Sequence, residues 1–136
     1  MKTVYLLFST ILFFSACNSA KTDTKKSILK NETYTIIKLI ENNVSSTNMS
    51  ITFNEETSKI SGNTGCNSYF GDYTYKDNTI SFSGVGATKK YCPKISKIEK
   101  LLLNTLKETT QVYKNATDEI LFKNSDDKVV IIAKLQ

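Results

Sequence analysis

Three cysteines, Cys17, Cys66 and Cys92, are the residues of this sequence with the most definable chemistry. A thiol can carry a lipid, form a disulfide or bind a metal, depending on its neighbours and its compartment. A zinc site needs four ligands, and the chain has no His and no C-x-x-C pair. We therefore predict no metal site and no cofactor.

Cys17 follows Phe14-Ser15-Ala16, and this segment looks like a lipobox. Two small side chains before the Cys let a signal peptidase approach the backbone, the thiol takes a diacylglycerol, and cleavage exposes the amine. Phe14 stands where Leu is usual, but it is also large and apolar. The alternative is an ordinary structural cysteine. We predict that Cys17 is lipidated and becomes the N-terminus of the mature chain.

Residues 1–16 have the organisation of a lipoprotein signal peptide. Lys2 precedes the apolar runs 4–8 and 11–14. The apolar stretch, about eleven residues, fits a signal h-region and is shorter than the roughly 20 residues that span a bilayer. A buried strand or helix is the alternative. Residues 17–32 are polar and are expected to form a flexible tether, since they offer little apolar surface to offset ordering; 33–136 would form the domain.

Cys66 and Cys92 remain once Cys17 is used. An even number of cysteines in an exported chain favours a disulfide. Two free buried thiols remain an alternative. The sequence thus predicts a bridge between two positions inside the domain.

The charged residues give no positive sign of catalysis. Asp72, Asp77 and Glu99 are separated carboxylates without an evident pairing, and Thr88 has no base nearby in sequence. There is no His base, nucleophile elbow or phosphate loop. The chain has a net charge of +5, and its basic residues are all Lys. Without Arg, and after export, nucleic-acid binding is disfavoured, so we predict neither an enzyme nor a nucleic-acid partner.

Alternation of apolar and polar residues predicts short strands through most of the domain. In residues 66–76, Tyr69, Tyr73 and Tyr75 would share one face, with Phe70 on the other. Residues 84–86 would break the strand before them. The expected strands are 34–40, 49–53, 59–62, 66–76, 79–83, 111–114, 119–123 and 128–135.

One segment has helical periodicity instead. Apolar residues recur at spacings of three, four and four, predicting an amphipathic helix that ends near Thr109. Its start is open by one turn: Pro93 suits a first turn, whereas Ser96 and Glu99 fit a capping box. The fold class is α+β, a single domain with a curved or barrel-like antiparallel sheet of about eight short strands and the helix across one opening.

The segment Gly62-Asn63-Thr64-Gly65-Cys66-Asn67, followed by Gly71-Asp72-Tyr73, resembles the signature of the META domain, the family of HslJ-like heat-inducible lipoproteins. The resemblance extends over 33–135, although Tyr34 stands where the family often has Trp. The matched motif positions are Gly62, Gly65, Cys66, Asn67, Gly71, Tyr73, Thr88, Cys92 and Glu99.

Most motif residues have structural interpretations. The glycines would supply positive φ at turns or bulges. Asn67 would hold a turn through local hydrogen bonds, and Tyr73 would pack in the core with its hydroxyl satisfied. A ligand or partner site on the same loop is the alternative.

The first hypothesis is a non-catalytic, lipid-anchored envelope protein, for which the resemblance implies a stress-associated role at the cell envelope. The alternative is a small-ligand or peptide binding module that uses the open end of the barrel. An apolar pocket of a few hundred Å³ would favour the second, and a filled core the first. We expect a monomer that contacts a membrane through its lipid and an unidentified envelope protein or ligand. The outer membrane is favoured over the inner, with the domain facing the periplasm or the surface.

Overall fold

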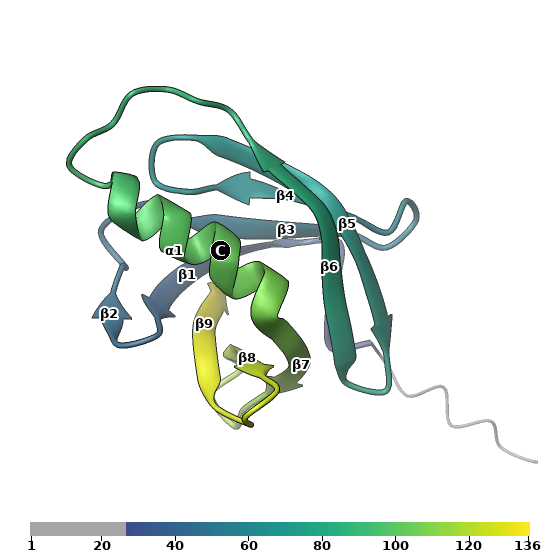
Figure 1. Ribbon diagram of the computed structural model, residues 1–136. Helices are drawn as coiled ribbons and strands as arrows, with labels where there is room; N and C mark the ends of the chain where they lie inside the picture. Colours follow the sequence, from purple (N-terminus) through teal and green to yellow (C-terminus); the bar gives the residue numbers. More distant parts are fainter. Residues whose placement is uncertain (1–26) are drawn as a thin grey trace, which may run out of the picture.

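The computed structural model describes residues 27–136 as a closed antiparallel barrel with one helix (Figure 1). The predicted signal peptide and Cys17 lie outside the described residues. The sheet runs in the order β2-β1-β3-β4-β5-β6-β7-β8-β9, and β1 also pairs with β9, which closes the barrel. The elements are β1 (Thr33–Leu39), β2 (Asn42–Asn43), β3 (Ser50–Asn54), β4 (Lys59–Asn63), β5 (Ser68–Lys76), β6 (Thr79–Ala87), α1 (Ser96–Glu108), β7 (Thr109–Lys114), β8 (Ile120–Asn124) and β9 (Val129–Leu135).

Side-chain alternation sets which face of each strand enters the core. In β5, Tyr69 and Tyr73 are buried, whereas Phe70 is 61% exposed. The predicted faces of this strand are therefore confirmed. The turn after β5 forms because Asp77 and Asn78 both adopt positive φ, a conformation that these side chains tolerate.

Aromatic side chains fill the interior of the barrel. Phe53 lies at their centre, with its ring centroid 5.1 Å from that of Tyr73 and 6.3 Å from that of Phe122. Tyr34 and Phe82 complete the cluster. Edge-on and offset contacts at these distances are favourable beyond the area they bury. The interior is thus packed, and the α+β barrel predicted from the sequence is confirmed.

Helix α1 lies across one opening of the barrel (Figure 1). Leu102 and Leu106 are fully buried beneath it, in agreement with the predicted apolar stripe. The helix begins at Ser96, within the turn that the sequence left open, but the predicted capping box is wrong. Ile95 is the N-cap and no side chain caps the helix, while Pro93 precedes the first turn. α1 has 13 residues, and within 27–136 no helix has the length and apolarity to cross a membrane.

The prediction that residues 84–86 break the strand is also wrong. β6 continues to Ala87 through a bulge, because two residues of β6 oppose Gly71 alone. Gly84 has a φ of 60° at this point. A glycine in the left-handed region lets a strand absorb one extra residue and keep pairing.

The packed domain begins before residue 33. Leu29 is fully buried in the core, although the sequence predicts a flexible tether over residues 17–32. The Lys30 N–H donates to the Tyr34 hydroxyl at 3.3 Å. Leu29 lies in a polar segment, and this pattern is too weak to predict from the sequence where the tether ends and the domain begins.

Candidate functional site

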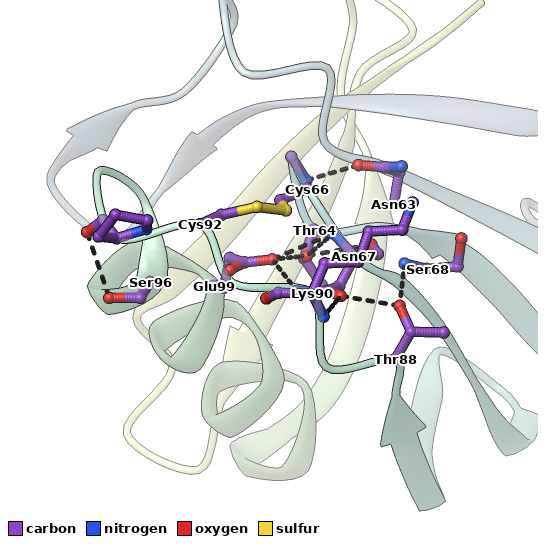
Figure 2. The surroundings of a disulfide bond; sticks show 12 residues. Asn63, Thr64, Cys66, Asn67, Ser68, Thr88, Lys90, Cys92, Ser96 and Glu99 are labelled. Carbon is purple, nitrogen blue, oxygen red and sulfur yellow. Dashed lines mark hydrogen bonds between the residues drawn. A yellow bond between two sulfur atoms is a disulfide. The ribbon is translucent and has the colours of Figure 1, made fainter.

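Several of the motif residues converge where the β4–β5 loop meets the start of α1 (Figure 2). Thr64 and Asn67 come from the loop, Thr88 and Lys90 from the β6–α1 connection, and Glu99 from the first turn of the helix. These five residues are defined here as the polar cluster. Their side chains and backbone groups bring together three segments that are distant in sequence.

Glu99 is the centre of the polar cluster. Its side chain points inward, and the residue is only 8% exposed. One oxygen, Oε1, accepts hydrogen bonds from the Thr64 hydroxyl, from the Asn67 side-chain amide at 3.0 Å and from the Asn67 backbone N–H at 3.2 Å. A buried carboxylate is costly unless donors compensate for its lost hydration. These three donors supply that compensation, and Glu99 is therefore unavailable as a helix cap.

Asn67 connects Glu99 to the β6–α1 connection. Its Oδ1 accepts from the Thr88 hydroxyl at 2.8 Å and from the Lys90 N–H at 2.7 Å. Its Nδ2 also donates to the Lys90 carbonyl at 3.3 Å. The amide thus uses both its acceptor and its donors. One side chain of the β4–β5 loop thereby fixes the backbone that leads into α1.

A disulfide joins Cys66 to Cys92 beside the polar cluster, with their Cα atoms 6.5 Å apart (Figure 2). The predicted bridge is present, and the free-thiol alternative does not hold. The bond joins the β4–β5 loop to the residues just before α1. It therefore runs alongside the hydrogen bonds of Asn67 and links the same two segments.

Two motif glycines are required by close approaches. At Gly62, a Cβ would overlap the Ser50 carbonyl and lie 2.7 Å from the Tyr69 ring. The missing side chain lets Tyr69 lie across β4 and donate its hydroxyl to Ser50 O at 2.9 Å. Burial raises the pKa of the Tyr69 hydroxyl above its usual value. Gly65 has a φ of 99°, which a residue with a side chain rarely adopts.

The remaining motif residues lie away from the polar cluster. Tyr73 packs against Phe53 in the core as predicted. The Tyr73 hydroxyl has no protein hydrogen-bond partner within the described residues and is not enclosed, whereas the buried Tyr69 hydroxyl donates to Ser50 O. Gly71 lies opposite the β6 bulge, where its Cβ would approach Val85 at 3.1 Å.

The carboxylates do not form a catalytic pair. Asp72 is exposed and pairs with Lys59 at 2.9 Å, and Asp77 lies in the β5–β6 turn. Thr88 donates to an amide oxygen, which is not a base. Within 27–136, no three acidic, Cys or His side chains are grouped so as to hold a metal. In this arrangement the polar cluster joins the β4–β5 loop, the β6–α1 connection and the first turn of α1.

Sequence reasoning missed two parts of this site. Thr64 was treated as a variable position of the motif, although it is fully buried and bonds to Glu99. Lys90 contributes only backbone atoms, which no residue-type pattern can reveal. The sequence feature that could have pointed to Thr64 is its position two residues before Cys66, on the same tight loop.

A surface hollow of about 410 Å³ opens beside the polar cluster. Thr88, Lys90 and Leu103 are among its lining residues, and Glu99 also lines it. The second oxygen of Glu99, Oε2, has no protein donor within the described part of the chain. This hollow lies at the rim of the barrel, outside the aromatic core.

Comparison with known proteins gives one family match and several similar folds. The model of the META domain family matches residues 27–136. No curated protein matches this chain. The solved structures below are less than 25% identical to it and support the fold alone.

An NMR structure of a protein from Burkholderia xenovorans shares 21% identity with a TM-score of 0.62, covering 80% of this chain and 84% of its own. A second NMR structure shares 22% identity with a TM-score of 0.62, covering 79% and 91%. The crystal structure of a DUF4847 family protein from Bacteroides vulgatus shares 12% identity with a TM-score of 0.56, covering 76% and 92%.

Proposed function

Because this chain belongs to the META domain family, we propose that it is a non-catalytic protein anchored by lipid in the bacterial cell envelope. The observation that carries the non-catalytic part of the proposal is that the side chains of the polar cluster bind one another within the domain. Glu99 Oε1 accepts from Thr64 and twice from Asn67, and the Asn67 amide is itself fully engaged. A general base needs a carboxylate positioned to take a proton from a substrate. Glu99 is instead positioned by donors that join the helix to the barrel.

The packed interior supports a non-catalytic domain over a module that binds a ligand inside the barrel. A small-ligand or peptide binding module that uses the open end of the barrel remains the second candidate, since the hollow of about 410 Å³ lies at the rim. Phe53, Tyr73 and Phe122 occupy the space that a ligand would need. Lipocalin-like barrels that hold a ligand keep this space open. The envelope protein is therefore the better-supported of the two functions expected from the sequence.

The Cys66–Cys92 bond supports an extracytoplasmic location. Disulfides persist in the periplasm and on cell surfaces and are rare in the reducing cytosol. The lipobox at Cys17 would then attach the domain to a membrane. An acylated cysteine carrying two or three chains gives a stable anchor, since a single chain binds only marginally. We propose the outer membrane as the site and a monomer as the state, with a stress-associated role as the family resemblance implies.

Fractionation of cells that express the wild-type chain or Cys17→Ser tests this proposal. The wild type should sediment with membranes and carry a diacylglycerol on an N-terminal cysteine by mass spectrometry. The Cys17→Ser chain should lose the lipid and accumulate as uncleaved precursor. An intact Met1 N-terminus without lipid in the wild type would contradict the anchor.

A further inference from the structure

The β6–α1 connection and the exposed side of α1 carry an unusual concentration of lysines. Within 89–108 there are six Lys and two acidic residues: Glu99, which is buried in the polar cluster, and Glu108, the last residue of α1. All six lysines are exposed. The lysine face is defined here as Lys89, Lys90, Lys94, Lys97, Lys100 and Lys107.

The pairing of these lysines differs from that elsewhere in the domain. None of the six forms an ion pair within the described residues. Outside the lysine face, eight lysines are described, and only Lys76 and Lys128 lack a carboxylate within ion-pair distance. The positive charge of the lysine face is therefore uncompensated by neighbouring side chains.

The distribution of charge is polarised as a result. Residues 89–108 carry a net charge of +4, whereas the other described residues have eight Lys and ten acidic residues, a net charge of −2. Tyr91 also lies in this segment and is 90% exposed. Tyr is favoured at membrane–water interfaces, where its ring meets the headgroups. One side of the barrel thus combines unpaired cations with an exposed interfacial aromatic residue.

We propose that the lysine face binds the anionic phospholipid headgroups of a bilayer. Lysine is a strongly hydrated point charge without the fixed fork of Arg. A set of exposed lysines therefore suits diffuse attraction to a charged surface, in which each contributes about 1 kcal/mol. The hollow lined by Lys89, Lys90 and Lys100 does not favour insertion of a phosphate, because the acidic residue Glu99 also lines it. Binding accordingly occurs at the rim of the hollow and along the helix.

The lysine face lies away from the end of the barrel where the described chain begins. The Glu55 N–H, in the β3–β4 turn, donates to Asn31 Oδ1 at 2.6 Å, whereas the polar cluster lies at the other end of that hairpin. Ten residues can span at most about 35 Å, and a domain of this size has a radius of gyration of about 13 Å. An anchor at Cys17 would therefore allow the lysine face to reach the same bilayer.

Vesicle flotation with the chain from Asn18 to Gln136, which lacks the acylation site, tests the proposal. Binding to vesicles with phosphatidylglycerol should exceed binding to pure phosphatidylcholine and should be lost at high salt, since screening shortens the range of the attraction. K97Q/K100Q should bind about thirty-fold more weakly, which corresponds to two lysines at about 1 kcal/mol each.

K76Q/K128Q is the matched control, because it removes the same charge from exposed, unpaired lysines outside the lysine face. It should bind almost as the parent chain does, and circular dichroism should show that both variants are folded. Equal weakening by the two double variants, equal binding to both kinds of vesicle, or no binding would overturn the proposal. The assayed chain has no lipid, so these outcomes are independent of whether Cys17 is acylated.

Discussion

Asn67 and Glu99, 32 residues apart in sequence, are joined by two hydrogen bonds that end on the same carboxylate oxygen. The Asn67 side-chain amide donates at 3.0 Å and its backbone N–H at 3.2 Å. The contact fixes the first turn of α1 to the β4–β5 loop. The helix covers one opening of the barrel, so this contact helps to keep that end closed.

Removing the Glu99 carboxylate should destabilise the domain. Glu99→Ala leaves buried donors on Thr64 and Asn67 without their acceptor, which should cost about 2–4 kcal/mol. Glu99→Gln retains an acceptor oxygen and should cost about 1 kcal/mol, because a neutral acceptor bonds less strongly than a charged one. Urea denaturation gives both values. Glu108→Ala is the control on the exposed part of the same helix and should change stability by less than about 0.5 kcal/mol; equal losses for Glu99→Ala and Glu108→Ala would refute this role.

Loss of the Cys66–Cys92 bond should destabilise the domain by a similar amount. The closed loop spans 26 residues, for which the chain-entropy model gives about 3.5 kcal/mol. Cys66→Ser and Cys92→Ser should each lower the melting temperature by several degrees or more, and the double variant should lose no more than either single one. Thiol titration of denatured, unreduced protein lacking Cys17 should find no free thiol. Two free thiols would show that the bridge does not form in solution.

Gly62 and Gly86 offer a matched test of close packing, since both lie within strands. A Cβ at Gly62 would overlap a backbone carbonyl that cannot move independently, so Gly62→Ala should cost more than about 3 kcal/mol. At Gly86 the nearest atoms are ring carbons of Phe70 at 3.4 Å and 3.5 Å, an ordinary contact, and Gly86→Ala should change stability by less than about 0.5 kcal/mol. Thermal melts compare the two directly, and similar melting temperatures would contradict the close approach at Gly62.

Separate carboxylate and hydroxyl variants test for catalysis. We expect that Asp72→Asn, Asp77→Asn, Thr88→Ala and Glu99→Gln, each verified as folded and exported, restore a deletion strain to wild-type growth under envelope stress. The reason is that Asp72 pairs with Lys59 on the surface and Thr88 donates to Asn67, so neither is arranged to act on a substrate. A folded, normally exported variant that behaved like the deletion would point to an active site.

The strands could be predicted because each buries alternate side chains, and β5 shows this clearly with Tyr69 and Tyr73 inward and Phe70 outward. The helix could be predicted from its apolar period. Its N-terminal capping could not, because Ser96 and Glu99 fit a local capping pattern, while Glu99 is instead held by a loop distant in sequence. A local sequence pattern predicts hydrogen bonds between residues that are close in sequence. It cannot predict a more favourable partner that is distant in sequence and becomes close only in the folded domain.

The same limit explains the other differences. Gly84 and Gly86 read as a strand break, but pairing with β5 continues through the bulge. The motif positions themselves were found through the resemblance, since Gly62 and Asn67 act through contacts across strands and loops. The polar cluster could therefore be located from the sequence, whereas its hydrogen bonds could not.

A double-mutant cycle between Asn67 and Glu99 tests most directly the claim that the motif side chains hold this domain together. Unfolding free energies would be measured for the parent chain, Asn67→Ala, Glu99→Ala and the double variant. We predict a coupling of about 1–3 kcal/mol. The pair Asn67 and Glu108 should give less than about 0.5 kcal/mol, since nine helical residues place Glu108 about 13 Å along α1 from Glu99. A coupling near zero between Asn67 and Glu99 would contradict the account and leave the carboxylate free for another role.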